Sequence, residues 1–160
     1  MTGIFGKVQE GEVSLEIRRL GDEHIDGLIK LYEFNKTNFE HFFPHPFTKE
    51  AIAEVIETSV LDLYYVVVFN DTIIGYGMLR GMDEGYDVPS LGIAVDKAVY
   101  GTGVAVTLME FLETTSRLYG YKKMRLRVFK ANPRAYNFYI KLGYTYEPYD
   151  EESVLGFKEL

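Results

Sequence analysis

The chain contains no cysteine and no long apolar run, and these absences exclude several classes of protein. Without cysteine it has no disulfide, no thiolate zinc site and no cysteine nucleophile. No segment approaches the roughly 20 apolar residues that a membrane-spanning helix needs, so we expect no membrane association. The N-terminal residues lack the basic start and apolar core of a signal peptide. A cytoplasmic protein is therefore expected.

Positive charge is also in short supply. The 160 residues include 17 Lys and Arg against 24 Asp and Glu, a formal net charge of −7. Because nucleic acids are bound by basic surfaces, we expect no nucleic-acid partner. The negative charge can steer a cationic amine toward the protein, or it only keeps the chain soluble. Length and a 47% hydrophobic content predict a single globular domain, residues 1–160.

Two glycines stand where a predicted strand leads into a predicted helix. Leu91–Asp96 has the length and composition of a buried strand, and apolar residues recur at helical spacing over Val104–Leu118. Between them lie Gly101 and Gly103. The first N–H groups of a helix have no intrahelical partner, and the helix dipole adds positive charge there. The turn over Gly101–Ala105 is thus a candidate phosphate site, the alternative being a turn that only starts a helix.

Two common phosphate-binding motifs do not fit this turn. A P-loop ends in Gly-Lys-Ser/Thr, but Gly103 is followed by Val104 and Ala105. The dinucleotide fingerprint requires a third glycine where Val106 stands, which disfavours a nucleotide-binding α/β domain.

A second helix with clear ends follows the next strand, Lys123–Phe129. Asn132 suits the N-cap, Pro133 the first helical position, and Gly143 the position after the helix. Tyr139 lies on the inward face of this helix. On these residues alone it is a core aromatic whose hydroxyl finds a partner.

Together the two segments resemble the GCN5-related N-acetyltransferase (GNAT) family. The resemblance is carried by Gly101-x-Gly103 and by Asn132-x-x-Ala135-x-x-Phe138-Tyr139-x-Lys141-x-Gly143-Tyr144. It implies that residues 89–144 form an acetyl-CoA-binding core and that residues 22–60 form the acceptor-substrate region. The implied reaction is direct transfer of an acetyl group from acetyl-CoA to a primary amine of a small molecule or peptide.

The resemblance also implies roles for individual residues. Tyr139 corresponds to the tyrosine that acts as a general acid toward the CoA sulfur. The implied cofactor contacts are Ile93, Ala94, Val95, Gly101, Thr102, Gly103, Val104, Ala105, Asn132, Phe138 and Tyr139. By family habit the chain is also expected to form a homodimer.

The sequence departs from the family pattern at two places. Where the family usually has Arg or Gln three residues before Gly101, this chain has Ala98, and Tyr100 replaces a common basic or amide residue. No Glu lies at the start of the strand containing Ile93. The nearest carboxylates in sequence are Asp83, Glu84 and Asp87 on the preceding acidic loop, and of these Glu84 is the candidate base. A solvated loop charge, a water-relayed proton and an amine arriving neutral remain as alternatives. These departures favour a second hypothesis, a non-catalytic acyl-CoA-binding module of the same fold.

An aromatic segment punctuated by prolines, Phe39–Phe47, follows the first predicted helix. His41 and His45 are four residues apart, but two prolines oppose a helix and no acidic or cysteine cluster completes a site, so we expect no metal. Such a segment either fills a core or lines a pocket. The family resemblance favours an acceptor-substrate wall that contains His41, Phe42, Phe43 and His45.

The predicted fold is α+β in three layers. It has a central mixed, mostly antiparallel sheet of six to seven strands, flanked on both faces by about four helices. The expected strands are 13–20, 63–69, 72–79, 91–96, 123–129, 144–147 and 154–158. Asp22 is expected to cap a helix over 23–35, and Thr48 to begin another. The strands on either side of the helix from Gly103 to Tyr119 should run parallel, because a helical crossover joins them.

Overall fold

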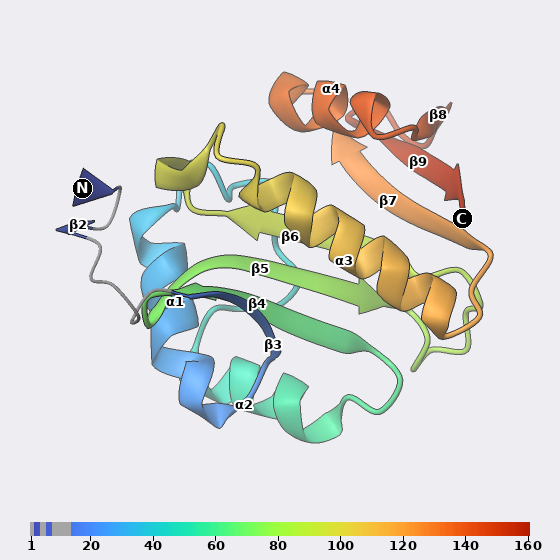
Figure 1. The fold of residues 1–160 in the computed structure, drawn as a ribbon. Helices are drawn as coiled ribbons and strands as arrows, with labels where there is room; N and C mark the ends of the chain where they lie inside the picture. The colour runs from blue at the N-terminus through green and yellow to red at the C-terminus, as the bar shows by residue number, and fades with distance from the viewer. Residues whose placement is uncertain (1, 4–5, 8–13) are drawn as a thin grey trace.

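The computed structural model describes residues 2–3, 6–7 and 14–160, and their main feature is a seven-stranded sheet (Figure 1). The strands lie in the order β3-β4-β5-β6-β7-β9-β8. All neighbouring pairs in this sheet are antiparallel except β6 and β7. The bounds are β3 Leu15–Arg19, β4 Leu63–Phe69, β5 Thr72–Arg80, β6 Ser90–Val95, β7 Lys123–Phe129, β8 Thr145–Pro148 and β9 Ser153–Glu159. Two short strands, β1 Thr2–Gly3 and β2 Gly6–Lys7, pair separately. The prediction of a mixed, mostly antiparallel sheet is confirmed.

Four α-helices cover the two faces of the sheet, two on each. The helices α1 Ile25–Phe34 and α2 Lys49–Thr58 pack on one face, and α3 Val104–Leu118 and α4 Pro133–Lys141 pack on the other (Figure 1). The alternation of side chains along a strand builds both cores at once. In β4, Tyr64 and Val66 face α1 and α2, whereas Leu63 and Val67 belong to the core under α3. None of the helices in the described ranges is long and apolar enough to cross a membrane.

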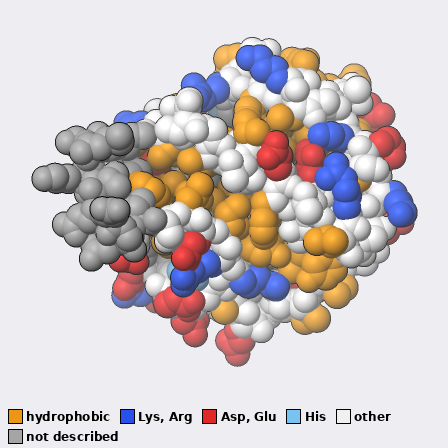
Figure 2. All heavy atoms as spheres, viewed as in Figure 1, with side chains coloured by type: hydrophobic (Ala, Val, Ile, Leu, Met, Phe, Trp, Pro, Cys, Tyr) orange, Lys and Arg blue, Asp and Glu red, His pale blue; other side chains and the backbone are white. Residues whose placement is uncertain are grey.

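The helix α3 packs closely on the middle of the sheet and leaves its edge less covered. A Cβ atom at Gly77 of β5 would lie 3.0 Å from a Leu108 methyl and 3.1 Å from a Leu112 methyl, so this glycine lets α3 approach β5. On the edge strand β3 and its neighbour, Ile17 and Tyr65 are only partly buried. Figure 2, drawn from the same side as Figure 1, shows hydrophobic side chains on this face among charged groups of both signs.

Most of the predicted turns and caps are present. Asn70 and Asp71 both have positive φ, 49° and 61°, as a tight hairpin turn between β4 and β5 requires. The Thr48 hydroxyl accepts the Ala51 N–H at 3.2 Å at the start of α2, as predicted. Val13 of the first predicted strand lies outside the described residues.

The predicted cap at Asp22 is wrong. A 3-10 turn over Asp22–His24 precedes α1, and Gly21 is its N-cap. The Gly21 N–H donates to His24 Nδ1 at 3.0 Å. Because this imidazole takes up the backbone donor of the N-cap residue, the helical turn starts one residue earlier and Asp22 lies inside it.

The pairing of β6 with β7 is short, and this positions the site. Their ladder consists of one residue pair, Ser90 opposite Arg125, with the Arg125 N–H donating to the Pro89 carbonyl at 3.0 Å. Beyond this point the two strands diverge toward their carboxyl ends (Figure 1). Since parallel strands are otherwise bonded along their length, the divergence opens the sheet between them.

Candidate active site

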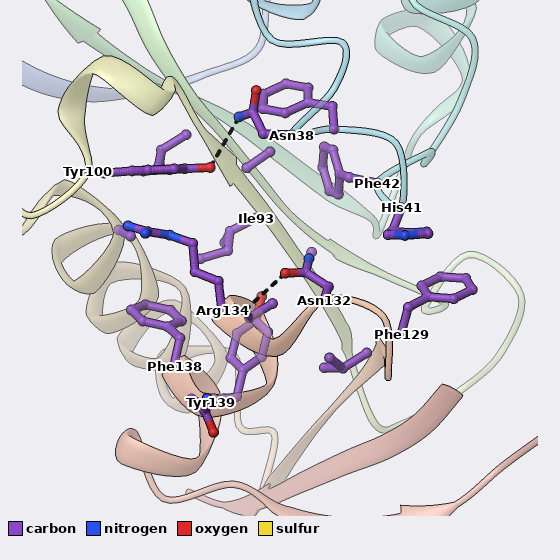
Figure 3. Close-up of a pocket in the computed structure, with 18 of the residues that line it drawn as sticks. Asn38, His41, Phe42, Ile93, Tyr100, Phe129, Asn132, Arg134, Phe138 and Tyr139 are labelled. Carbon is purple, nitrogen blue, oxygen red and sulfur yellow. Dashed lines mark hydrogen bonds between the residues drawn. The ribbon is translucent and has the colours of Figure 1, made fainter. Parts of the chain in front are cut away.

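A pocket of about 950 Å³ lies where β6 and β7 separate. Its walls come from four segments: residues 37–42 after α1, residues 91–95 of β6, the glycine turn before α3, and the end of β7 with α4. Figure 3 shows these segments converging from opposite layers of the fold. The predicted core of residues 89–144 and the predicted acceptor region of residues 22–60 therefore meet at one cavity.

The glycine turn adopts a conformation that requires glycine. Gly101 and Gly103 have φ angles of +79° and +93°, and Gly103 is the N-cap of α3. A Cβ at either position would meet no atom within 4 Å, so the requirement comes from the backbone and not from crowding. Gly101, Gly103 and Ala105 line the pocket. Thr102 and Val104 belong to the same turn but are not among the residues that line the pocket. The N-terminal end of a 15-residue helix thus faces an open space.

A buried asparagine that sequence reasoning missed holds this turn in place. Asn35, only 1% exposed, follows α1, and its Nδ2 donates to the Leu31 carbonyl at 2.9 Å. Its Oδ1 accepts the Lys97 N–H at 2.9 Å, which joins the start of the turn to α1. The two partners are 62 residues apart, so no local sequence signal indicates the contact.

Arg134 brings a positive charge to the glycine turn, which has Ala98 where Arg or Gln is usual in the pattern described above. The Arg134 guanidinium, in the first turn of α4, stands 3.6 Å from the centroid of the Tyr100 ring. The Tyr100 hydroxyl accepts a hydrogen bond from Asn38 Nδ2 at 3.2 Å. Figure 3 shows this chain of three side chains crossing one end of the pocket. Tyr100 therefore orients a positive charge that comes from a different element.

The helix α4 brings two aromatic side chains to the pocket. Asn132 Oδ1 accepts the Ala135 N–H at 3.2 Å and starts the helix as predicted. Phe138 and Tyr139 then project from α4 toward Ile93 (Figure 3). Tyr139 is 8% exposed, and its hydroxyl makes no hydrogen bond with any residue the structure describes. Burial raises the pKa of this phenol, so it is protonated at neutral pH and able to donate into the pocket.

Along the pocket, backbone N–H and C=O groups of β6 point into the gap between β6 and β7. The Asp96 N–H donates to the Ile74 carbonyl on β5, whereas the Pro89 carbonyl accepts from Arg125 on β7. Because N–H and C=O groups point alternately to the two sides of a strand, those of Ile93 point to the side that β7 has left. Ile93, Ala94 and Val95 all line the pocket.

Two of the four predicted acceptor residues reach the pocket and two do not. His41 and Phe42 line it. Phe43 is 68% exposed and lies outside it. His45 is buried against Tyr64 and Tyr76, because the chain bends at Pro44 and His45. Nε2 of His45 lies 2.7 Å from the Tyr76 hydroxyl, and burial lowers the pKa of this imidazole. His45 is therefore a neutral core residue.

The predicted base, Glu84, is not among the residues that line the pocket. It lies in the connection between β5 and β6, next to Ser90. Ser90 pairs with Arg80 of β5 and with Arg125 of β7, so β6 and β7 are still joined at this closed end. Asp83 in the same connection accepts the N–H groups of Val60, Leu61 and Asp62, a structural role. The carboxylate that lines the pocket is Glu40, whose Oε1 lies 3.4 Å from His41 Nε2. Sequence reasoning missed it, since a single Glu in an aromatic loop carries no signal.

The fold and pocket define a class in which a sheet splits beside a glycine turn. Solved structures of that class match nearly the whole chain. A PaiA N-acetyltransferase from Thermoplasma acidophilum, in complex with coenzyme A, is 20% identical with a TM-score of 0.78, covering 92% of this chain and 99% of that one. An N-acetyltransferase from Staphylococcus aureus Mu50 is 19% identical, with a TM-score of 0.73 and coverages of 92% and 98%. The ribosomal L7/L12 α-N-protein acetyltransferase RimL, in complex with coenzyme A, is 16% identical, with a TM-score of 0.74 and coverages of 92% and 94%.

The sequence itself settles the family. The model of the acetyltransferase (GNAT) family matches residues 28–144, which include the loop after α1, the glycine turn and α4. No curated protein matches the chain in sequence. The chain belongs to the GNAT acetyltransferase family.

Proposed function

We propose that the protein is an acetyl-CoA-dependent N-acetyltransferase that modifies a primary amine. The observation that carries the proposal is the convergence of three features on one pocket: the left-handed glycine turn, the open edge of β6, and the Tyr139 hydroxyl, which has no hydrogen-bond partner among the described residues. Two structural relatives were solved in complex with coenzyme A, which supports the choice of co-substrate.

The glycine turn and Arg134 suit the diphosphate of the co-substrate. At the start of α3 the Val104 N–H donates to Thr102 Oγ1 at 3.4 Å, and the N–H groups that follow it, together with the helix dipole, favour an anion beside the turn. The Arg134 guanidinium adds a full positive charge at the same end of the pocket. This arrangement compensates for the absence of Arg or Gln at Ala98, because charge-assisted hydrogen bonds are the stronger kind.

The open edge of β6 suits the amide-bearing arm of the same molecule. An extended chain with amide groups can pair with the N–H and C=O of Ile93 as an added strand would. A backbone N–H at this edge is also positioned to donate to the thioester oxygen, where negative charge develops during attack.

Tyr139 suits the role of general acid. In the reaction the amine nitrogen attacks the thioester carbonyl carbon, a C–N bond forms, the C–S bond breaks and the sulfur leaves as a thiolate. Tyr139 keeps its proton because burial raises its pKa, and it can transfer that proton to the leaving sulfur. A hydroxyl already bonded to the protein would be less free to do so.

A second candidate is a non-catalytic acyl-CoA-binding module, and the replacement by Ala98 is the observation that favours it. The two hypotheses share the co-substrate and differ in turnover. We would incubate the protein with acetyl-CoA and a panel of primary amines: phenethylamine, spermidine, lysine and an α-amino tripeptide. An N-acetylated product and stoichiometric free CoA thiol are expected for at least one amine. Binding of acetyl-CoA without transfer to any amine would favour the second candidate.

A further inference from the structure

The transfer reaction requires a group that accepts a proton from the acceptor, and the pocket offers few. A primary amine is mostly an ammonium ion at neutral pH and has no lone pair until it loses a proton. The ionisable side chains that line the pocket are Glu40, His41, Tyr100, Arg127, Arg134, Tyr139 and Lys141. Arginine, lysine and tyrosine hold their protons at neutral pH. Of the lining residues, Glu40 and His41 are left as proton acceptors.

These two side chains form a pair with a defined geometry. Nε2 of His41 lies 3.4 Å from Oε1 of Glu40. The imidazole also stacks on the ring of Phe129 at the end of β7, with centroids 4.8 Å apart and planes 23° apart. The His41 side chain is 31% exposed and the Glu40 side chain 64% exposed. The stack holds the plane of the ring, and the Glu40 carboxylate lies on its Nε2 side, so Nδ1 is the ring nitrogen away from the carboxylate.

The pair lies at the end of the pocket opposite the glycine turn. In Figure 3, His41 and Phe129 face each other on one side, and Tyr100 and Arg134 stack on the other. Among the lining residues Glu40 is the sole carboxylate, so negative charge marks the end remote from Arg134. An ammonium group is attracted to that end, and the phosphates to the end with Arg134 and the helix dipole.

The charges packed around His41 are few. Glu40 comes from its own loop, and Arg127 of β7 has its guanidinium 4.8 Å from the Phe129 ring centroid on which His41 stacks. Asp150 pairs with Arg127 at 2.9 Å and offsets its positive charge. Glu40 is thus the charged group nearest to His41 among these neighbours, and the cation of Arg127 is paired with Asp150.

We propose that His41 is the general base of this acetyltransferase, with Glu40 as the positioning residue that orients it. The proposal rests on the proposed function. Nδ1 of His41 takes the proton from the ammonium, directly or through one water, and the neutral amine nitrogen then attacks the thioester carbon. This proton ends on the imidazolium and passes to solvent after product release, while the attacking nitrogen loses its second proton to the phenolate that Tyr139 becomes when it protonates the leaving sulfur.

The test is the pH dependence of kcat/KM with acetyl-CoA and the best amine of the panel described above. His41→Gln should lower kcat/KM about 100-fold at pH 7. The loss should shrink as the pH rises toward deprotonation of the free amine, because an amine that arrives neutral needs no base. His41→Phe keeps an aromatic ring to stack on Phe129 and should lose the same activity. Glu40→Gln should give a smaller loss, about 3- to 10-fold.

The controls separate this role from stability and from the proposed function. Glu33→Gln removes an exposed carboxylate on α1 away from the pocket and should match wild type. All variants should show the wild-type thermal shift with CoA. If His41→Phe retains the wild-type kcat/KM across the pH range, His41 only packs against Phe129. The proposal is then overturned, while the transferase function stands. If wild type binds CoA but transfers to no amine, both proposals fall.

Discussion

The two ends of the pocket are built by different means. The end with the glycine turn and α4 is formed by short segments whose backbone conformation is set locally, by Gly101, Gly103 and the Asn132 cap. The opposite end joins His41 to Phe129, residues 88 positions apart in the sequence (129 − 41), through a ring stack. Backbone requirements leave a sequence signature, whereas side chains that meet only through the fold do not.

The two ends also differ in charge, which agrees with separate tasks. Arg134 and a helix N-terminus stand at the first, and Glu40 with His41 stands at the second. An anionic co-substrate and a cationic acceptor would therefore enter complementary fields. Tyr139 lies on α4 between them and is expected to act on the bond that is broken.

The largest expected effect is a loss of kcat on changing Tyr139, the residue between the two ends of the pocket. Tyr139→Phe should lower kcat about 100-fold and leave the affinity for CoA unchanged, since only the proton donor is lost. Steady-state kinetics and calorimetric titration with CoA would measure the two quantities. Tyr144→Phe is the matched control. It removes a buried hydroxyl that lies 3.3 Å from Glu113 Oε1 outside the pocket, and should reduce stability but not kcat. Unchanged kcat in Tyr139→Phe would remove Tyr139 as the acid.

A smaller effect is expected from strain in the glycine turn. Gly103→Val places a β-branched residue at a φ of +93°, where strain of about 1–3 kcal/mol should distort the turn. We expect the dissociation constant for CoA to rise about 10- to 100-fold, as measured by calorimetry.

Gly85→Val is the control for that strain. Gly85 has the same φ of +93° and also has open space around it, but it lies in the loop between β5 and β6. The Gly85→Val variant should lose about as much stability as Gly103→Val and keep the wild-type affinity for CoA. Equal CoA affinities in both variants would show that the turn does not hold the phosphates.

The next effect concerns the cation at the same end. Arg134→Ala should weaken CoA binding about tenfold, or about 1.4 kcal/mol, and make the remaining affinity less sensitive to salt. Adding Ala98→Arg to that variant should recover affinity, since it restores the cation usual in the family. Arg117→Ala removes a half-exposed cation of α3 that lies outside the pocket, and serves as the control. Loss of affinity in Arg117→Ala alone would contradict the assignment of Arg134.

The smallest effect concerns the buried imidazole of His45 and the pH dependence of the free energy of unfolding. Burial holds the pKa of His45 below the ordinary histidine value of about 6.5, so the unfolded chain takes up this proton first as the pH falls. The free energy of unfolding should therefore decrease below about pH 6.5, by at most about 1.4 kcal/mol per pH unit, until the folded pKa is reached. Urea unfolding of wild type and His45→Gln between pH 7.5 and 5 would measure this, with a flatter dependence in the variant. Parallel curves would show that His45 is not the group responsible.

The same contrast explains what could be predicted from the sequence. The sheet, the hairpin at Asn70 and Asp71, the glycine turn and α4 follow from turn residues, caps and periodicity, and these are local properties. What the sequence could not predict is which side chains line the pocket. Glu84 is near Ser90 in sequence but belongs to the closed end of the β6–β7 pair, and His45 is directed into the core by a bend at Pro44. Glu40, Arg134 and Asn35 acquire their roles only through partners on distant elements.

The central claim is that the pocket between β6 and β7 holds CoA. It is tested most directly by a thermal-shift titration with acetyl-CoA, free CoA and NAD in parallel. Ligand at about 100 times its dissociation constant stabilises the native state by about 2.7 kcal/mol, which should raise the unfolding midpoint by roughly 5–10 °C. We predict this shift with both CoA species and none with NAD. No shift at saturating CoA, or a shift with NAD alone, would contradict the account.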